Sequence, residues 1–339
     1  MKKMKILVSS LEPSANLHLS EILKSFQFEM VGIFDEKFGT PIYSSKEFSV
    51  MGFFDVLPKI LKAKKAIKEL ADLSKECDKV LLIDAPSFNI PLAKEIKKTN
   101  PNIEIIYYIL PKVWAWKKGR IKTINEYIDK KAYIFPFEKE YWGDGYVGNP
   151  LLDEITTFRD DVLYNQVAFL AGSRKSEIKS LMPIFREIAK KIDSKKVLVV
   201  PKIYKDNMDI YRDISDFEIS FDTHSTLLHS DFAYICSGTA TLEAAIIGTP
   251  FVLMYKARQI EYMIAKAFVK LNYVGLANII FEKEGLDEFH KEYLQEFDIN
   301  TLIKDYKNND LTKWLEKSAK IREILKFGST QNVIKLLKN

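Results

Sequence analysis

The sequence predicts an α/β protein made of two doubly wound domains, each with a parallel sheet between layers of helices. Three observations carry this prediction. The chain has 339 residues, which is long for a single core and fits two domains of about 150–170 residues. Short apolar runs alternate with amphipathic stretches, as in repeated strand–helix units. This rhythm breaks near residues 153–163 and then restarts.

The first half of the chain carries apolar runs of strand length, separated by stretches with helical spacing. The predicted strands cover Lys5–Ser9, Met30–Phe34, Lys79–Asp84, Ile103–Leu110 and Lys131–Phe135. The predicted helices cover Asn16–Phe26, Lys59–Cys77 and Pro91–Thr99. Because the strands are continuously apolar rather than alternating, we expect them to be buried on both faces of a parallel sheet.

The second half repeats this architecture without repeating its residues. The predicted strands cover Gln166–Leu170, Lys196–Val200, Phe232–Cys236 and Pro250–Tyr255. Helices are expected from the loop Ala171–Glu177 to about Lys191, over Thr241–Ile247, and in one or two pieces over Trp314–Leu337. We place the first domain at residues 1–157, the second at 158–320, and a terminal helix at 321–339.

Composition excludes several classes of protein. A net charge of +5 is too small to indicate nucleic-acid binding. Cys77 and Cys236 form no redox or metal motif and are expected to be reduced thiols, as in the cytosol. The four histidines are scattered, so no metal site is expected. No stretch has the length of a membrane span or of a secretory signal, which predicts a soluble or surface-attached protein.

Ligands of open parallel sheets bind at the carboxyl ends of the strands, and Ser237–Glu243 follows such a strand. Gly238 permits close backbone approach, while Ser237, Thr239 and Thr241 offer hydroxyl groups. A helix start there favours a phosphate, and Glu243 could accept ribose hydroxyls. The alternative is an ordinary helix cap.

The segment Gly172–Lys175 also lies between a predicted strand and a helix. Ser173 and Arg174 would place a hydroxyl and a permanent cation where a pyrophosphate could bind. The alternative is a solvated basic turn. Because both loops belong to one predicted sheet, they could converge on a single diphosphate.

Two acidic residues follow predicted strands of the first domain. Asp84 could act as a general base, although a turn or capping role before Pro86 is the commoner one. Glu12 precedes Pro13 at the start of a helix, where capping by Ser14 or Asn16 would explain most of the segment.

Residues 50–65 combine bulky apolar side chains with lysines. This composition is typical of a segment that lies in the interface of an anionic bilayer, but also of a core helix with a lysine-rich wet side. The candidate membrane-facing residues are Phe53, Phe54, Val56, Leu57 and Ile60.

Motifs along nearly the whole chain resemble the lipid-A-disaccharide synthases, which are glycosyltransferases of the GT-B fold. The matching segments are Glu12–Ser14, Val50–Gly52, Ile83–Pro86, Pro111–Trp116, Pro136–Glu138, Val147–Pro150, Gly172–Arg174, Ser237–Glu243 and Tyr273–Asn278. The first loop departs from the family's usual Gly-Glu-x-Ser-Gly-Asp, since Leu11, Ala15 and Asn16 replace its glycines and its last acid. Ser87 and Ala277 replace the family's usual aspartate and proline.

The resemblance implies two domains facing across a cleft, with the last helix returning to the first domain. It implies inverting transfer of 2,3-diacylglucosamine from its UDP derivative to the 6-hydroxyl of 2,3-diacylglucosamine 1-phosphate, without a metal or other cofactor. Asp84, Arg174 and Glu12 would be catalytic. The nucleotide-sugar site would add Ser173, Ser237, Gly238, Thr239, Thr241, Glu243, Tyr255, Asn278 and Gln295.

The resemblance also implies a cytoplasmic enzyme on the inner-membrane surface, with a homodimer as a further expectation. Two other functions fit the same motifs. One is a different GT-B enzyme, such as a UDP-N-acetylglucosamine 2-epimerase, which needs no lipid surface and no acceptor. The other is a non-catalytic protein that binds UDP-sugars or lipids, in which Asp84 would be dispensable.

Overall fold

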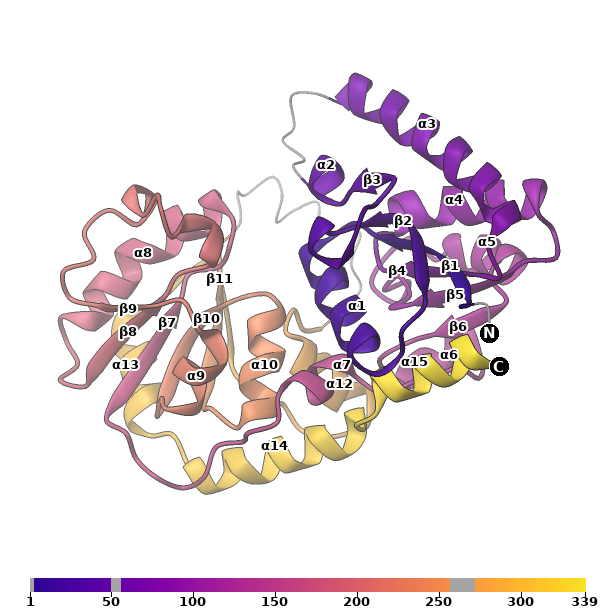
Figure 1. The fold of residues 1–339 in the computed structure, drawn as a ribbon. Helices are drawn as coiled ribbons and strands as arrows, with labels where there is room; N and C mark the ends of the chain where they lie inside the picture. Colours follow the sequence, from indigo (N-terminus) through magenta and orange to yellow (C-terminus); the bar gives the residue numbers. More distant parts are fainter. Residues whose placement is uncertain (1–2, 50–55, 257–271) are drawn as a thin grey trace. The chain divides into compact units, whose positions relative to one another are not determined.

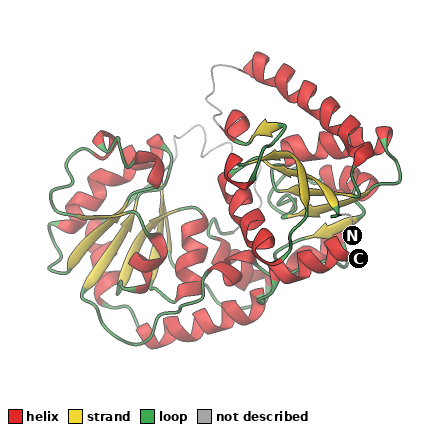
Figure 2. Cartoon of the chain, viewed as in Figure 1, coloured by secondary structure: helices red, strands yellow, loops and turns green. Residues whose placement is uncertain are grey.

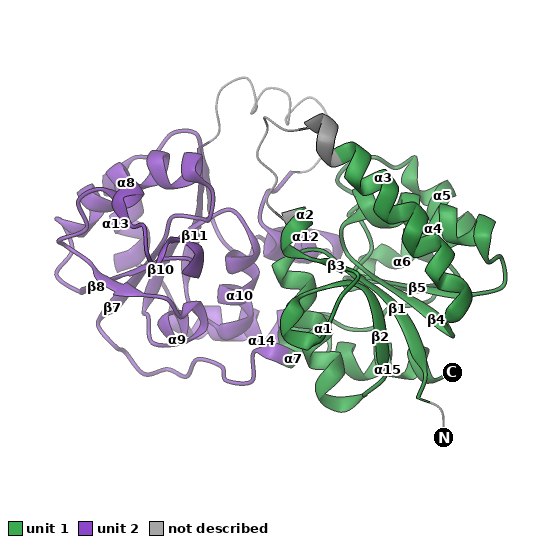
Figure 3. Cartoon of the chain, turned by 45° about the horizontal axis from the view of Figure 1, so that its top comes forward, with its two compact units in different colours: residues 1–153, 325–339 green, residues 154–324 purple. Residues whose placement is uncertain are grey.

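A computed structural model describes residues 3–49, 56–256 and 272–339. The chain divides into two compact units (Figure 3). Unit 1 comprises Met1–Asp153 and Leu325–Asn339, and unit 2 comprises Glu154–Ile324. Each unit is described by itself below.

Unit 1 contains a parallel six-stranded sheet in the order β3-β2-β1-β4-β5-β6 (Figure 1). Its strands are β1 Lys5–Ser10, β2 Glu29–Phe34, β3 Tyr43–Ser44, β4 Lys79–Ile83, β5 Glu104–Tyr108 and β6 Lys130–Ala132. Its helices are α1 Pro13–Ser25, α2 Lys46–Ser49, α3 Val56–Leu73, α4 Pro86–Thr99, α5 Arg120–Tyr127, α6 Lys139–Trp142, α7 Pro150–Glu154 and α15 Ser329–Lys338. Short 3₁₀ turns lie at Glu36–Phe38, Ser74–Glu76 and Pro136–Glu138.

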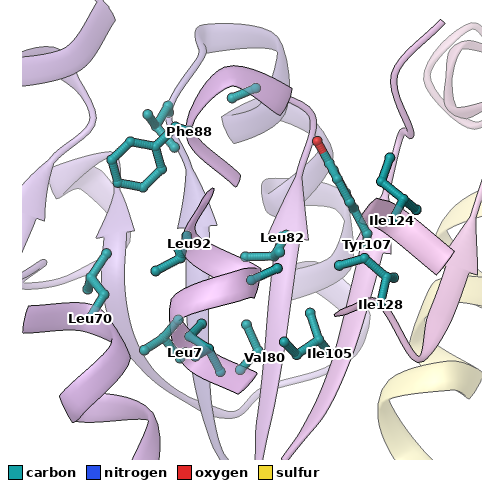
Figure 4. Packing of buried hydrophobic residues seen from close by; sticks show 14 of the residues in the cluster. Leu7, Leu70, Val80, Leu82, Phe88, Leu92, Ile105, Tyr107, Ile124 and Ile128 are labelled. Atoms are coloured by element: carbon teal, nitrogen blue, oxygen red, sulfur yellow. The ribbon is translucent and has the colours of Figure 1, made fainter. Parts of the chain in front are cut away.

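Successive residues of the central strands point to opposite faces of this sheet, and each face has its own apolar core. One face carries Leu7, Val80, Leu82, Ile105 and Tyr107, which pack against residues of α3, α4 and α5 (Figure 4). The other face carries Ile6, Val8, Leu81, Ile83, Ile106 and Tyr108, which pack against α1 and α15. Burial on both faces accounts for the continuously apolar strands of the sequence.

The C-terminal helix α15 belongs to unit 1, as the family resemblance implies. Val333, Ile334 and Leu337 are buried in the core beneath the sheet. Asp153 accepts hydrogen bonds from the N–H groups of Gly328 and Thr330 at 2.8 and 2.7 Å, which satisfies donors at the start of the helix.

Unit 2 contains a second parallel sheet, with the order β12-β11-β10-β7-β8-β9 among its described residues. Its strands are β7 Gln166–Leu170, β8 Lys195–Val199, β9 Glu218–Ser220, β10 Phe232–Cys236, β11 Phe251–Tyr255 and β12 Glu292–Leu294. Its helices are α8 Lys175–Ala189, α9 Thr223–Leu228, α10 Thr239–Ile247, α12 Leu276–Lys283, α13 Ile299–Lys307 and α14 Leu311–Leu325, with 3₁₀ turns at Lys202–Tyr204 and Asp209–Tyr211. Side chains of β7, β8, β10 and β11 pack against α8 and α13.

The alternation of helix and strand (Figure 2) confirms the predicted fold class, and the differences concern where elements begin and end. Helix α10 starts at Thr239 rather than Thr241, so less of the loop after β10 is irregular. Strand β6 ends at Ala132, three residues before the predicted end. Within residues 3–49, 56–256 and 272–339, no helix is both long and apolar enough to cross a membrane.

Candidate functional site

Each sheet has one point at which the strand order reverses direction, and the candidate residues cluster there. In unit 1 the chain moves outward from β1 to β3 and outward the other way from β4 to β6, so the reversal lies between β1 and β4. In unit 2 it lies between β7 and β10. A crevice forms outside the carboxyl ends of the strands at such a reversal. The loops after these four strands contain Glu12, Asp84, Arg174 and Ser237.

The reversal in unit 2 holds a cavity of about 550 Å³, which is within the usual size range for small-molecule sites. The walls come from the loops after β7 and β10 and from the segments after β8 and β9. The lining residues are Leu170, Gly172, Ser173, Arg174, Glu177, Val199, Pro201, Thr223, Cys236, Ser237, Gly238, Thr239 and Ala240. The structure thus brings together two loops that lie more than sixty residues apart in the sequence.

Glu177 organises the loop after β7. Its carboxylate accepts the N–H of Arg174 at 3.2 Å and pairs with the Arg174 guanidinium at 2.9 Å. Gly172 has a φ of +88°, and a Cβ there would lie 2.5 Å from Glu177 Oε2, so only glycine fits. The Arg174 side chain remains 75% exposed. A permanent cation is therefore held at the mouth of the cavity.

The loop after β10 leads directly into helix α10. Ser237, Gly238 and Thr239 line the cavity. The first N–H groups of an α-helix have no carbonyl partner four residues earlier within the helix, and of those in α10 the N–H of Thr241 donates to the Gly238 carbonyl at 3.3 Å. A Cβ added at Gly238 would meet no protein atom within 4 Å. Thr241 is fully buried, and its hydroxyl donates to the carbonyl of Gly238 at 2.8 Å. This hydrogen bond ties Thr241 to the loop before the helix and leaves its hydroxyl occupied within the protein.

Four further candidate nucleotide residues, like Thr241, lie outside the cavity lining. Glu243 lies 3.3 Å from Nε2 of His224, and this contact raises the pKa of the imidazole. Tyr255 ends β11, and Gln295 follows β12 and donates its N–H to the Tyr255 carbonyl at 2.9 Å. Both lie at the same carboxyl edge as the two loops, because all these strands are parallel.

Asn278 is 1% exposed, and its amide group is engaged within the protein. Its oxygen accepts the N–H groups of Phe289 and His290 at 2.8 and 3.0 Å. Its nitrogen donates to the His290 carbonyl and to Glu292, both at 2.8 Å. In this structure Asn278 ties α12 to the segment that enters β12.

In unit 1, Glu12 and Asp84 lie in neighbouring loops, because Ser10 of β1 pairs with Ile83 of β4. Burial raises the pKa of Asp84, and the N–H of Ala85, Lys112 and His18 act in the opposite direction. Burial and the charge of Asp84 also raise the pKa of Glu12. Two neighbouring carboxyl groups with raised pKa values are typical of acid–base sites.

Sequence reasoning assigned no role to several residues around Asp84. The surrounding protein displaces water from the Lys112 ammonium group and lowers its pKa, while the charges of Asp84 and Glu138 raise it. Glu138 is 1% exposed, accepts the indole N–H of Trp114 at 3.0 Å, and has a pKa raised by burial to about 7. The motifs Pro111–Trp116 and Pro136–Glu138 are therefore joined by a buried hydrogen bond, which neither motif reveals alone.

Of the candidate membrane-facing residues, Phe53 and Phe54 lie outside the described residues, and for Val56 and Leu57 only the backbone is described, as the first turn of α3. Ile60 and Leu61 of the same helix are 45% and 65% exposed. Ala66 and Leu70 point into the core. Helix α3 therefore has a buried face and an exposed face that carries apolar residues beside lysines.

Two doubly wound units, one of them with a cavity at a helix start, define the GT-B class of enzymes, which includes glycosyltransferases. Solved structures share this fold. MurG of Acinetobacter baumannii aligns with a TM-score of 0.61 at 12% identity, over 99% of each chain. A UDP-GlcNAc 2-epimerase from Neisseria meningitidis, bound to UDP-GlcNAc, aligns with a TM-score of 0.57 at 15% identity, over 100% of each chain.

Sequence comparison resolves the family. The profile of the lipid-A-disaccharide synthetases matches residues 6–335. A lipid-A-disaccharide synthase of Campylobacter jejuni is 48% identical, over 98% of each chain. One of Helicobacter pylori is 45% identical, over 97% of this chain and 96% of the relative. The chain belongs to the lipid-A-disaccharide synthetase family.

Proposed function

We propose that the chain transfers 2,3-diacylglucosamine from UDP-2,3-diacylglucosamine to the 6-hydroxyl of 2,3-diacylglucosamine 1-phosphate, releasing UDP and a β-1,6-linked disaccharide 1-phosphate. Family membership over nearly the whole chain supports this reaction. One structural observation supports it most: in each unit, the candidate catalytic or binding residues lie where the strand order of the sheet reverses, which is where ligands of such sheets bind.

Unit 2 would bind the UDP moiety of the donor. When the sugar leaves, negative charge develops on the diphosphate, and the cavity offers two means of stabilising it. Arg174 supplies a permanent cation at the cavity mouth. The start of α10 supplies backbone N–H groups and the positive end of a helix dipole. Donors fixed before the reaction stabilise such charge without reorganising during it.

Unit 1 would activate the acceptor through Asp84. An inverting displacement needs one base to take the proton from the attacking hydroxyl group. Burial raises the pKa of Asp84 and therefore makes the carboxylate a stronger base than an exposed aspartate. Glu12, in the adjacent loop, would orient the acceptor or tune this carboxylate, since its own pKa responds to the charge of Asp84.

Helix α3 and the residues before it would hold the protein on a lipid surface, as two acylated substrates require. Ile60 and Leu61 are exposed apolar residues, and Lys64, Lys65 and Lys68 are exposed cations on the same helix. Apolar side chains enter the acyl boundary while lysines contact anionic headgroups. In this proposal, the exposed face of α3 contacts the membrane.

The test incubates the purified protein with both acylated substrates and follows UDP and disaccharide. We expect Asp84→Asn and Arg174→Ala to lower turnover at least about 1,000-fold, the range for loss of an essential base or charge stabiliser. The matched controls are Asp78→Asn, at the opposite end of β4, and Arg186→Ala, further along α8. Both should retain activity.

The same assay separates the competing functions. A 2-epimerase would convert UDP-N-acetylglucosamine without an acceptor, and a binding protein would retain UDP without forming disaccharide. Because the folded state raises the pKa of Asp84, the ionised carboxylate is less stable there than in the unfolded chain, so Asp84→Asn should not lower the melting temperature. Turnover like that of the parent in Asp84→Asn would disprove the proposed base.

A further inference from the structure

The backbone at the start of α4 adopts an unusual conformation. Asp84 and Ala85 have φ values of +49° and +44°, so two consecutive residues with side chains lie in the left-handed region. A Cβ atom makes this region unfavourable, and such residues persist only when the surroundings hold them. Neither position is glycine, although glycine would adopt the turn without strain. Something else must stabilise this turn.

Two buried side chains hold the turn through one atom, the carbonyl oxygen of Asp84. The amide nitrogen of Asn89 donates to it at 2.8 Å, and to the Ile83 carbonyl at 3.2 Å. The phenol of Tyr107 donates to the same Asp84 carbonyl at 2.8 Å. Asn89 and Tyr107 are both fully buried. In Figure 4 the Tyr107 hydroxyl points away from Val80, Ile105 and Ile128, toward the opposite end of the apolar cluster.

A third side chain fixes the orientation of the Asn89 amide. The hydroxyl of Ser9, in the neighbouring strand β1, donates to Oδ1 of Asn89 at 2.6 Å. Ser9 is fully buried as well. With its oxygen occupied, the amide directs its nitrogen toward the two carbonyl groups at the end of β4. The network therefore joins β1, β4, β5 and α4 at the strand-order reversal of unit 1.

The carboxylate of Asp84 is tied to the same turn. It accepts the N–H of Ala85, a hydrogen bond that favours the ionised form. Rotation of the peptide between Asp84 and Ala85 would therefore move both the carbonyl held by Asn89 and the donor that faces the carboxylate. The orientation of this peptide therefore determines where the carboxylate points.

We propose that Asn89 and Tyr107 are positioning residues for the transfer reaction: they hold the strained peptide after Asp84 and so aim its carboxylate at the acceptor hydroxyl. This inference rests on the proposed role of Asp84 as the base. A misdirected base slows the chemical step, because effective catalysis requires the reacting groups within a fraction of an ångström of their productive geometry.

The first test measures kcat, the KM for the acceptor and the melting temperature of Asn89→Ala and Tyr107→Phe. We expect kcat to fall about 10- to 100-fold, the cost of about 1 Å of misplacement, with KM for the acceptor nearly unchanged. The matched control is Tyr108→Phe, which removes an equally buried hydroxyl that contacts Ser329 at 2.8 Å on the other face of the sheet. Tyr108→Phe should lower stability and leave kcat unchanged.

The second test adds Ala85→Gly to Asn89→Ala and to Tyr107→Phe. Glycine adopts the left-handed conformation without the strain of a Cβ atom. If the two side chains act by holding this conformation, Ala85→Gly should restore kcat by about fivefold or more in each background. A purely structural role of Asn89 or Tyr107 predicts no such rescue, since Ala85→Gly removes apolar contacts and adds none.

The outcomes separate this inference from the function beneath it. Inactive Asp84→Asn together with unchanged kcat in Asn89→Ala and Tyr107→Phe would overturn the positioning role. Full activity of Asp84→Asn would instead remove the base itself. If Asn89→Ala does not fold, Tyr107→Phe alone and combined with Ala85→Gly tests the positioning role, because Tyr107→Phe removes only one oxygen atom.

Discussion

The carboxylate of Glu177 binds Arg174 twice: Oε2 accepts its backbone N–H at 3.2 Å, and Oε1 lies 2.9 Å from its guanidinium nitrogen. Glu177 is nearly buried, with a side chain 8% exposed, whereas the Arg174 side chain is 75% exposed. A long flexible cation loses rotamer freedom when it binds a ligand. A partner that restrains it beforehand reduces this loss. Glu177 therefore restrains Arg174 before any ligand binds.

Glu177→Ala should lower kcat/KM for the donor about tenfold, equivalent to about 1.4 kcal/mol, because the guanidinium loses its restraint. It should also lower the free energy of unfolding by about 1 kcal/mol through loss of the capping interaction at α8. Steady-state kinetics and urea unfolding measure the two effects. Glu187→Ala, on the exposed face of the same helix, is the control. Reduced stability with unchanged kcat/KM would limit Glu177 to capping.

The sequence was sufficient to predict the four loops that contain Glu12, Asp84, Arg174 and Ser237. Each loop follows a continuously apolar strand and carries charged or hydroxyl side chains that the strand itself does not require. Arg174 and Asp84 were identified in this way. The sequence could not predict that the two loops of each unit flank a reversal of the strand order. The order β3-β2-β1-β4-β5-β6 depends on packing between distant segments. The strands β3, β9 and β12 have two or three residues, too few to show a period.

Partners that lie far apart in the sequence also explain what the motifs concealed. Asn278 belongs to a motif that suggested a nucleotide contact, but its amide binds the backbone at Phe289 and His290. Asn89 follows Asp84 by one and a half helical turns, and nothing local shows that Ser9 and Tyr107 join it. A hydrogen-bond network is a property of the fold, so sequence reasoning identifies its members only by chance.

Helix α3 should bind anionic lipid through its exposed apolar residues. Ile60→Glu combined with Leu61→Glu should weaken binding to vesicles that contain phosphatidylglycerol about 100-fold, since burial of each such side chain contributes about 1.5–3 kcal/mol. Co-sedimentation measures this binding. The control combines Leu163→Glu with Ile203→Glu, two apolar residues of unit 2 that are even more exposed, at 74% and 75%. Equal loss in both proteins would show that added negative charge, not the α3 surface, governs binding.

His290 should make unit 2 sensitive to acid. Burial lowers the pKa of its imidazole from 6.5 to about 4. As the pH falls from about 6.5 to about 4, the unfolded chain binds a proton that the folded state does not, so stability decreases over this range. The decrease should reach about 3 kcal/mol at pH 4. Urea unfolding at a series of pH values measures it.

His290→Asn removes the titrating group and should flatten this part of the pH dependence, even though the variant is less stable at neutral pH because a buried ring packed against Phe251 is lost. His229→Asn, at an exposed position, should leave the pH dependence of the parent protein in place. An unchanged slope in His290→Asn would assign the acid sensitivity to other groups.

Lys112 should determine the pH at which the proposed base is protonated. Its charge lowers the pKa of Asp84, against the stronger effect of burial. Since the base acts in its ionised form, turnover is lost as the pH falls through this raised pKa. Lys112→Met removes the stabilising charge, so the pKa of Asp84 rises further and the acid limb of the kcat profile moves to higher pH.

The profile is measured with both substrates saturating, so that kcat reports the enzyme–substrate complex. Lys118→Met, an exposed lysine of the same loop, is the control and should leave the limb in place. A limb that stays in place or moves to lower pH in Lys112→Met would exclude a direct electrostatic effect of Lys112 on Asp84, because removal of a nearby positive charge raises the pKa of a carboxyl group.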